Sequence, residues 1–600
     1  MRKPLPYVVD TAKETRVRVV RLVVLTMFAL VIARLFYWQV LQSDRLKAEA
    51  ESQYNSVSTT NASRGRIFTA DGYPLVTNQD VYTVFANPKA LSEPAPAVAT
   101  QLMPFMMQTL DGIDVAQVAT DEARRKELET NWTSTLLSKL TTDASWVALK
   151  RKLPRPIKDQ ISSLQIGGLG FDREETRYYP EASMAAQLLG FVGNDDNGNP
   201  QGYFGIEGMF DRELRGKEGL LKQEKDAAGL PIALGAFDTI QSQDGRDIVL
   251  TIRRDLQFML EEKLKAGMEK YGSKTAEGVI MDPHTGAILA MASFPQYDPA
   301  KFYQYDPQLY KNPIVNDVYE PGSTFKILTV SAGIDAGAVQ PDTQCDACSG
   351  PMEINGYSIK TWNNKYYPNT TMTAGLIHSD NTAMMFAASK MGKDTFVNYI
   401  HSFGLGEKTD VDLQDEALPP LRSDWKDIDA ATASFGQGIA VTGIQMARIA
   451  QVIANGGVMM RPMLVASVKQ GDQTITVQPK EIRRVISKET ADKVTQMMIS
   501  SATYGDAKWA LPKGYSIAGK TGTAQVAISG HYDETKTVAS FVGFAPADNP
   551  KFVMLIKMRE PSTSQWGSET AAPLWFSIAR DLFMRLDVPP NPSLVPPPAP

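Results

Sequence analysis

The sequence is poor in the residues that most often bind metal ions. Its 600 residues include two cysteines and four histidines, and the histidines are scattered along the chain. A structural zinc site needs about four such ligands, and the sequence has no second cysteine pair to add to Cys345-Asp346-Ala347-Cys348. We therefore expect no metal site and no cofactor. The two cysteines form a disulfide, a redox pair or an inert reduced pair, and a disulfide fits best if this region lies outside the cell.

The sequence also lacks an excess of positive charge. The formal net charge is -5, with 43% hydrophobic and 22% charged residues. Nucleic-acid binding proteins usually show a basic surface, so nucleic acid is excluded as the expected partner. A chain of this length exceeds what one core organises, and two or more domains are expected.

Long hydrophobic runs are scarce, and the single strong one lies near the N-terminus. Residues 22–33 alone are too short to span a bilayer, but 19–41 suffice if Arg21 and Arg34 extend to the two interfaces. Aromatic residues at 36–38 suit the far interface. We expect a transmembrane helix at 19–41. A cleaved signal peptide is the alternative, but its candidate cleavage site, Ala48-Glu49-Ala50, lies too far downstream.

The charges beside this run predict its orientation. Lysine and arginine are enriched on the N-terminal side, which the positive-inside rule places in the cytoplasm. The residues concerned are Lys13, Arg16, Arg18 and Arg21. We expect a cytoplasmic tail at 1–18 and an extracytoplasmic chain after the helix, in a single-pass protein of the cytoplasmic membrane.

The remainder divides into two lobes and a tail. A first lobe is expected at 42–245, in which 90–165 is helical and peripheral. A second lobe is expected at 246–587, with antiparallel hairpins around 282–286 and 545–550 and helices at 254–271 and 573–586. The fold class is thus mixed α/β and multidomain, with a central antiparallel sheet covered by helices. The proline-rich residues 588–600 are expected to be disordered.

A serine and a lysine stand one helical turn apart in Glu320-Pro-Gly-Ser323-Thr-Phe-Lys326. Pro and Gly precede an apolar helical pattern, so Ser323 is predicted at a helix N-terminus, with Lys326 on the same face. A desolvated lysine can lose its proton and act as base to a serine nucleophile. A second Ser-x-x-Lys match, Ser423 to Lys426, lacks the Pro-Gly lead and the apolar helix.

Two further motifs supply the groups that such a serine needs. Ser379-Asp380-Asn381 offers a hydroxyl for proton relay and an amide for holding a substrate amide. Lys520-Thr521-Gly522-Thr523 offers a cation beside a glycine in a strand at 517–524. Its small residues permit a peptide backbone to dock as an added strand.

The three motifs together resemble those of class A β-lactamases and penicillin-binding proteins. Further segments resemble the class B, monofunctional penicillin-binding proteins, and they extend the similarity over nearly the whole chain. Arg177-Tyr-Tyr-Pro180 with Gly190-Phe-Val-Gly193 favours the division-specific, septal branch over the elongation branch. Thr442-Gly443 departs from the Thr-Pro that relatives commonly carry. The other segments are Arg64-Gly-Arg-Ile67, Asp71-Gly72, Gly205-Ile-Glu-Gly208, Phe435-Gly-Gln-Gly438 and Ala454-Asn-Gly-Gly457.

This resemblance implies a D,D-transpeptidase that cross-links peptidoglycan stem peptides, with the first lobe as a non-catalytic pedestal. Ser323 would be acylated and Lys326 would be the general base, while Ser379 would protonate the leaving amine. Asn381 would hold the donor amide, and the backbone N–H groups of Ser323 and Thr523 would form the oxyanion hole. The donor carboxylate would bind Lys520, with Thr521 and Thr523 beside Gly522.

The resemblance also implies partners and rivals. β-Lactams would acylate Ser323, and a membrane glycan polymerase would accompany the anchor and pedestal within a cell-wall synthesis complex. Alternatives are an elongation-type transpeptidase, a D,D-carboxypeptidase or a β-lactamase; a non-catalytic scaffold or β-lactam sensor fits least. Class D β-lactamases share Ser-Thr-Phe-Lys but carry an apolar residue where Asn381 stands, which argues against a β-lactamase.

Overall fold

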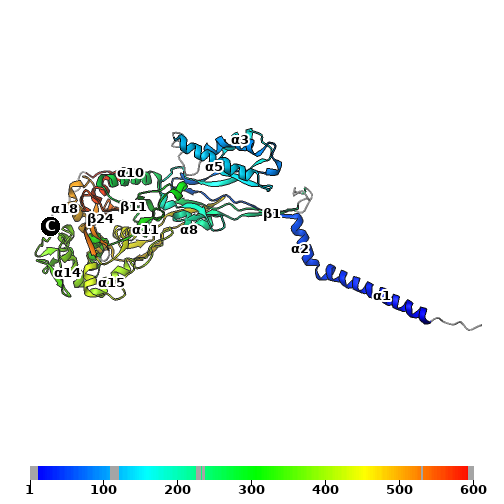
Figure 1. Cartoon of the computed structure of the whole chain (residues 1–600). Coiled ribbons are helices and arrows are strands. Elements are labelled where there is room, and N and C mark those ends of the chain that lie inside the picture. The colour runs from blue at the N-terminus through cyan, green and yellow to red at the C-terminus, as the bar shows by residue number, and fades with distance from the viewer. Residues whose placement is uncertain (1–10, 109–120, 225–231, 233–236, 529–530, 592–600) are drawn as a thin grey trace, which may run out of the picture. The chain divides into compact units, whose positions relative to one another are not determined.

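The computed structural model describes residues 11–108, 121–224, 232, 237–528 and 531–591 (Figure 1). The chain divides into two compact units, one of residues 1–62 and 216–244 and one of residues 63–215 and 245–600. Most of the tail predicted at 588–600, and part of that predicted at 1–18, lies outside the described residues.

The smaller unit contains the helix predicted to cross a membrane. Helix α1, Thr11–Phe36, continues through a π-helical turn at Tyr37–Leu41. Among the described residues, Glu14–Leu41 is the one stretch long and apolar enough to span a bilayer, with a mean hydropathy of 2.3. None of its most apolar window is buried, as expected of a helix made for lipid. Helix α2, Ser43–Tyr54, leads into an antiparallel sheet of β1 Asn55–Thr60, β8 Gly219–Glu224 and β9 Phe237–Ile240.

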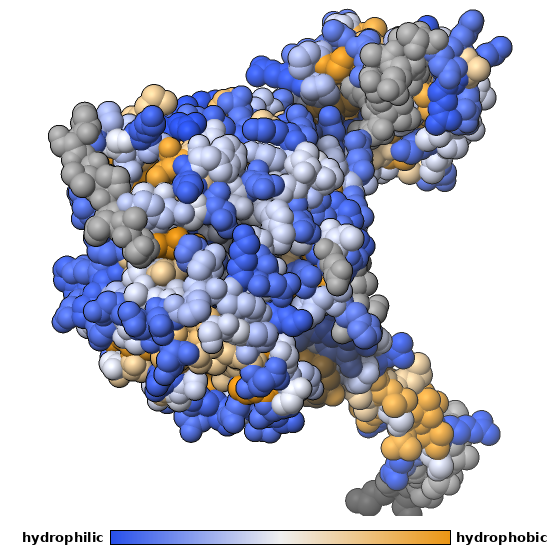
Figure 2. Space-filling view, turned by 90° about the vertical axis from the view of Figure 1, so that its left-hand side faces the viewer, coloured by the Kyte–Doolittle hydropathy of each residue, from blue (hydrophilic) through white to orange (hydrophobic). Residues whose placement is uncertain are grey.

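The surface of the larger unit has a different character from this helix. Figure 2 shows that the face turned to the viewer is mostly hydrophilic, with hydrophobic residues in separate small spots. Scattered apolar residues are normal on a protein surface that faces water. This face of the larger unit therefore resembles a protein surface in contact with water.

The larger unit is built on the central antiparallel sheet that the sequence predicted. Five strands lie in the order β12-β11-β25-β24-β23. Both predicted hairpins are confirmed, because β11 pairs with β12 and β24 pairs with β25, each antiparallel. The strands are β11 Thr275–Met281, β12 Ile288–Phe294, β23 Ala518–Ile528, β24 His531–Ala545 and β25 Phe552–Arg559.

Helices cover both faces of this sheet because its strands alternate apolar residues to both sides. Phe541 packs in a core with α10 and α19, whereas the next residue, Val542, packs in the larger core on the other face. The second face is covered mainly by α12, α14, α17 and α18. These helices are α10 Arg254–Tyr271, α19 Ala571–Arg585, α12 Lys326–Asp335, α14 Asn381–Met391, α17 Gly443–Ala454 and α18 Lys488–Tyr504.

A second sheet corrects the prediction that residues 90–165 are helical and peripheral. Helices α3, α5 and α6 are present there, but Val147–Pro154 forms strand β4 and pairs with β3. The sheet order is β21-β20-β10-β2-β3-β4, with β5 also paired to β3. The three helices are α3 Ala95–Gln108, α5 Glu122–Leu140 and α6 Arg155–Ser163. The other strands of the sheet are β2 Ile67–Phe68, β3 Pro74–Ala86, β5 Leu169–Tyr178, β10 Asp247–Leu250, β20 Val465–Gln470 and β21 Gln473–Thr476.

Strand β10 joins the two predicted lobes of the chain. It pairs with β2 from the first lobe in parallel and with β20 from the second lobe in antiparallel orientation. The lobe boundary near residue 245 stays a prediction, and a shared sheet crosses it.

Two arginines inside the first lobe share one buried carboxylate. The side chain of Glu207 is fully buried, and its Oε2 accepts hydrogen bonds from Arg64 while its Oε1 accepts one from Arg177. Arg64 also pairs with Asp211, and Arg177 donates to the side-chain oxygen of Asn78. This Arg64–Glu207–Arg177 cluster brings together three of the segments that carried the family resemblance.

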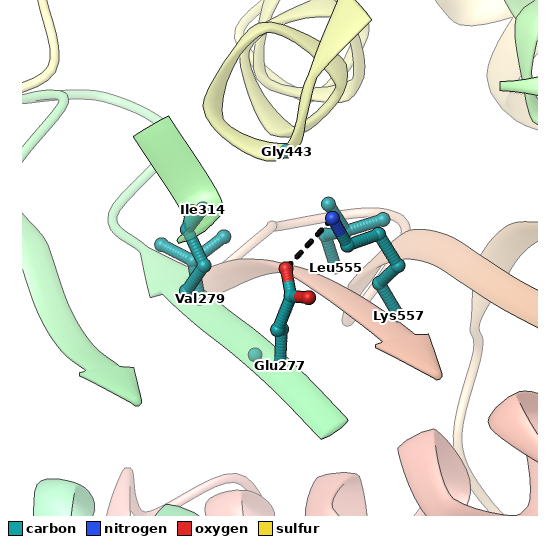
Figure 3. Close-up of a pocket in the computed structure, with 7 residues that line it drawn as sticks. Glu277, Val279, Ile314, Gly443, Leu555 and Lys557 are labelled. Carbon is teal, nitrogen blue, oxygen red and sulfur yellow. Dashed lines mark ion pairs between the residues drawn. The ribbon is translucent and has the colours of Figure 1, made fainter. Parts of the chain in front are cut away.

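A second buried ion pair lies inside the central sheet. Glu277 of β11 contacts Lys557 of β25 at 2.8 Å, and both side chains are at most 3% exposed (Figure 3). Lys557 also pairs with Asp317. Burial raises the pKa of Glu277 even though Lys557 opposes that effect.

Gly443, at the departure from the relatives' Thr-Pro, lines the small pocket beside this pair. It is the first residue of α17, and the side chain of Thr442 caps the helix by accepting from the N–H of Gln445. The helix therefore begins at this position without proline.

Candidate active site

Ser323 lies in a tight turn that leads directly into α12. The turn is a 3-10 helix at Gly322–Phe325, and the α-helix begins only at Lys326. The sequence predicted that Ser323 begins the helix; in the structure Ser323 lies in the short 3-10 turn just before the α-helix. Gly322 has a φ of +53°, and a Cβ there would lie 2.9 Å from the carbonyl oxygen of Thr523. Glycine is needed because the turn packs closely against β23.

The first two motifs meet through their side chains. The hydroxyl of Ser379 donates to Oγ of Ser323 at 2.8 Å. The ammonium of Lys326 lies 3.3 Å from Oγ of Ser379, and it donates to the backbone oxygen of Ser379 at 2.5 Å and to Oδ1 of Asn381 at 2.8 Å. A hydrogen-bonded route thus runs from Ser323 through Ser379 to Lys326.

The middle residue of the second motif has a role that the sequence analysis missed. Asp380 is the N-cap of α14, and its Oδ1 accepts from the backbone N–H of Thr382 at 2.7 Å. The preceding Ser379 adopts a φ of +55°. An aspartate directly before a helical pattern is a capping signal, and this signal was available in the sequence. The cap fixes the backbone that carries Ser379 and Asn381 on either side.

The third motif lies on an edge strand of the central sheet. Among the described residues, β23 is the last strand of the central sheet, and an edge strand is where a peptide can add to a sheet. Lys520 donates to Oγ1 of Thr521 at 3.2 Å, and Oγ1 of Thr523 accepts from the N–H of Gly567 at 2.9 Å. A Cβ on Gly522 would lie 2.5 Å from Oγ of Ser540 and 2.8 Å from the methyl carbon of Thr324. Only glycine lets the edge approach the serine turn this closely.

Both lysines of the site are buried, which lowers the pKa of each. Lys326 and Lys520 are at most 1% exposed. Burial, and then the charge of Lys520, lower the pKa of Lys326 well below its usual value. Burial lowers the pKa of Lys520 to about 8. A buried lysine with a low pKa can accept a proton at neutral pH.

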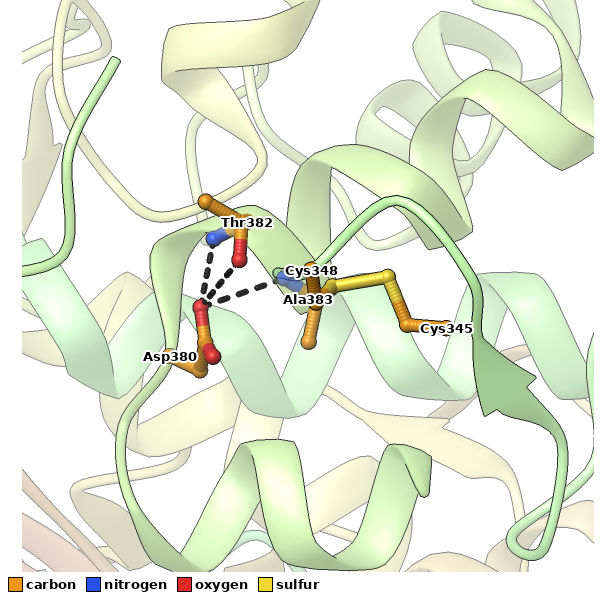
Figure 4. Close-up of a disulfide and its surroundings, with 5 residues drawn as sticks. All are labelled: Cys345, Cys348, Asp380, Thr382 and Ala383. Carbon is orange, nitrogen blue, oxygen red and sulfur yellow. Dashed lines mark hydrogen bonds between the residues drawn. A yellow bond between two sulfur atoms is a disulfide. The ribbon is translucent and has the colours of Figure 1, made fainter. Parts of the chain in front are cut away.

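The two cysteines and the second Ser-x-x-Lys match are the remaining residues that the sequence singled out. Cys345 and Cys348 form a disulfide with a Cα–Cα distance of 5.5 Å, away from solvent. Figure 4 shows this disulfide beside the start of α14, where Asp380 caps the helix. By contrast, Ser423 and Lys426 of the second Ser-x-x-Lys match are exposed. Of the two Ser-x-x-Lys matches, the one at Ser323 therefore lies with the other two motifs, and the one at Ser423 does not.

A partly exposed serine, a buried lysine and an edge strand lie together here, which is an arrangement typical of enzymes of the Ser-x-x-Lys type. Residues 277–583 match the penicillin binding protein transpeptidase domain, and residues 59–250 match the penicillin-binding protein dimerisation domain. The chain therefore belongs to the penicillin-binding proteins, as a class B transpeptidase of the serine type. The family resemblance and the fold class predicted from the sequence are both confirmed.

Individual relatives agree over nearly the full length. Stage V sporulation protein D of Bacillus subtilis is 31% identical over 94% of this chain and 84% of its own. Peptidoglycan D,D-transpeptidase FtsI of Escherichia coli is 29% identical over 95% of this chain and 91% of its own. Penicillin binding protein 2X from Streptococcus thermophilus has the same fold, with a TM-score of 0.71 at 24% identity over 88% of this chain and 80% of its own.

Proposed function

We propose that this transpeptidase cross-links peptidoglycan stem peptides through an acyl-enzyme on Ser323. The observation that carries the proposal is the hydrogen-bonded route from Ser323 through Ser379 to the buried Lys326. This route gives the nucleophile a proton acceptor in a site that a peptide can enter along β23.

In the acylation step, Oγ of Ser323 attacks the carbonyl carbon of the penultimate D-alanine of a donor peptide. Its proton passes to neutral Lys326, directly or through Ser379. Backbone N–H groups of Ser323 and Thr523 stabilise the oxyanion. The C–N bond then breaks, and D-alanine leaves as an amine that takes a proton from Ser379, which Lys326 replaces.

Binding of the donor uses the other motif residues. Asn381 binds the donor amide, and its contacts with Lys326 and with the backbone oxygen of Lys360 support this role by fixing its side chain. Lys520, Thr521 and Thr523 bind the terminal carboxylate around Gly522. A β-lactam enters the same site, and opening of its ring leaves Ser323 acylated.

The second step consumes the acyl-enzyme. The amine of a neighbouring stem peptide attacks the ester carbonyl and gives up a proton to Lys326. The ester C–O bond breaks, Ser323 regains its proton and an amide cross-link is formed.

Location and partners follow from the N-terminal helix and the family. The helix Glu14–Leu41 anchors the chain in the cytoplasmic membrane with its N-terminus inside, as the flanking basic residues favour. The catalytic unit then meets peptidoglycan outside, where Cys345 and Cys348 would stay oxidised. A membrane glycan polymerase supplies the strands for cross-linking, and the segments at 177–180 and 190–193 favour a septal role.

Product analysis with full-length protein in detergent and a synthetic stem pentapeptide tests the proposed reaction. We expect D-alanine release that is accompanied by a cross-linked dimer when an acceptor amine is present. Release of D-alanine without a dimer would instead indicate a carboxypeptidase. Rapid turnover of penicillin would indicate a β-lactamase, and no reaction with either substrate would indicate a scaffold or sensor.

The acylation rate is expected to have a bell-shaped pH dependence. On the acid side the second-order rate constant rises with pH, because Lys326 must lose its proton to act as base. Above about pH 8 it falls, because Lys520 loses the positive charge that binds the carboxylate. Stopped-flow acylation by a fluorescent penicillin measures the profile.

Lys520→Arg provides the control for this profile. Arginine keeps its charge throughout the measured range, so the alkaline limb should disappear even if the maximum rate is lower. An alkaline limb that persists in this variant would assign that limb to another group.

A further inference from the structure

A carboxylate beside the serine turn belongs to none of the three motifs. Glu320 lies three residues before Ser323 and is partly buried. Its Oε1 accepts a hydrogen bond from the backbone N–H of Gly438 at 3.0 Å. The hydroxyl of Tyr532 lies 3.1 Å from Oε1 and 3.0 Å from Oε2, and donates to this carboxylate. One side chain therefore joins three separate segments of the chain.

Glu320 directly precedes the serine turn, and the two segments that it contacts belong to the loop and the hairpin on either side of that turn. The N–H of Gly322 donates to the oxygen of Gly436 at 3.1 Å, and a Cβ on Gly436 would lie 2.1 Å from the oxygen of Gly322. On another side, a Cβ on Gly322 would lie 2.9 Å from the oxygen of Thr523. The turn is thus packed against both the 436–438 loop and β23, and a small shift of either would move Ser323.

Tyr532 holds the far end of the hairpin that carries the third motif. It lies near the start of β24 and is paired with Ala527 of β23, beyond a register shift between Gln525 and Val526. Strand β23 is an edge strand, and within the described part of the chain no other strand pairs with its outer side. A bond from Tyr532 to Glu320 supplies a fixed point on this hairpin.

We propose that Glu320 and Tyr532 are positioning residues that clamp the serine turn, the 436–438 loop and the β23–β24 hairpin into one catalytic arrangement. The proposal rests on the proposed role of Ser323. It assigns the clamp no contact with substrate. Its effect is to keep the Thr523 backbone at a constant position relative to Ser323, so that nucleophile and oxyanion donors stay aligned.

The chemistry of the pair suits a permanent contact. Burial and the neighbouring Glu320 raise the pKa of Tyr532 to about 12, so its hydroxyl stays protonated and able to donate. Burial raises the pKa of Glu320, whereas the hydrogen bonds from Gly438 and Tyr532 oppose this effect because they favour the ionised carboxylate. A hydrogen bond to an ionised carboxylate is stronger than one between neutral groups. Tyr532 is 44% exposed, so loss of its hydroxyl leaves no buried cavity.

Acylation of full-length protein by a fluorescent penicillin tests the clamp. Tyr532→Phe removes only the hydroxyl, and we expect a second-order acylation rate about tenfold lower, in the range for coupled neighbours. Glu320→Ala should lower the rate at least as much, and Glu320→Gln, which keeps an acceptor oxygen, should recover most of it. Tyr303→Phe, at a residue 58% exposed, is the matched control and should leave the rate unchanged.

A double variant separates a clamp from two independent effects. If the two side chains act through their mutual bond, Tyr532→Phe adds no further loss to Glu320→Ala. Losses that multiply in the double variant would overturn the proposal, as would a native rate in Tyr532→Phe. The total amount of protein that becomes labelled at saturation should stay native, since a loss there would show misfolding and would also overturn the clamp.

The clamp can fail while the proposed function stands. Labelling that depends on Ser323 together with a native rate in Tyr532→Phe would remove the clamp alone. Labelling that does not depend on Ser323 would remove the proposed function, whatever the clamp variants show.

Discussion

Ser323→Ala is expected to abolish covalent labelling by a fluorescent penicillin, with the acylation rate lowered by at least about 10⁴-fold. The effect is this large because the hydroxyl forms the covalent bond itself. The hydroxyl of Ser379 lies 2.8 Å from Oγ of Ser323, but Ser379 is not part of the turn that packs against β23. It should therefore not replace Ser323 as nucleophile.

The second Ser-x-x-Lys match provides an internal control. Ser423→Ala removes a hydroxyl from the same four-residue pattern, but at an exposed position outside the site, and labelling should stay native. Mass spectrometry of the labelled peptide should locate the adduct on Ser323. An adduct that persists in Ser323→Ala, or that maps to another residue, would contradict the proposed mechanism.

The parts of the fold that the sequence predicted well are those set by local patterns. Turn-forming residues at 282–286 and 545–550, each between two apolar runs, predicted both hairpins of the central sheet. The spacing from Ser323 to Lys326 predicted that both lie on one face of a turn. Each of these features depends on residues that are close together in the chain.

The assembly of the site required more than local patterns. Ser323 and Ser379 are 56 positions apart, and their contact could be expected only through the family resemblance. Strand β4 was missed because it contains three consecutive basic residues, at 150–152. A half-buried strand usually alternates polar and apolar residues instead. Pairing with β3 decides its structure, and tertiary contacts of this kind override local preference.

The bond between Glu320 and Tyr532 joins residues 212 positions apart. A glutamate before Pro321 carries no signal of its own in a single sequence, and neither does an isolated tyrosine. The same holds for Glu207, because burial of a carboxylate between two arginines would not be expected from the short segment Gly205–Met209 alone. Buried polar contacts over long separations thus had to come from the structure.

Glu207→Ala is expected to lower the free energy of unfolding of the first lobe by about 3–5 kcal/mol. The Glu207 side chain is fully buried, while those of Arg64 and Arg177 are 10% and 6% exposed. Truncation leaves Arg177 without its carboxylate and Arg64 with Asp211 alone. A buried charge without its partner is far more costly than the loss of an exposed pair.

Urea unfolding of the full-length protein in detergent, followed by tryptophan fluorescence, measures this change. Asp80→Ala breaks the exposed pair with Arg173 in the same lobe, at a similar distance of 2.8 Å, and should leave the unfolding midpoint unchanged. The sheet formed by β2, β10 and β20 joins this lobe to the catalytic part. The unfolding transition of Glu207→Ala should shift to lower urea concentration, whereas saturable labelling in the absence of urea should stay the same. Equal midpoints for the two variants would mean that the arginines find other partners, and that the cluster does not hold the lobe together.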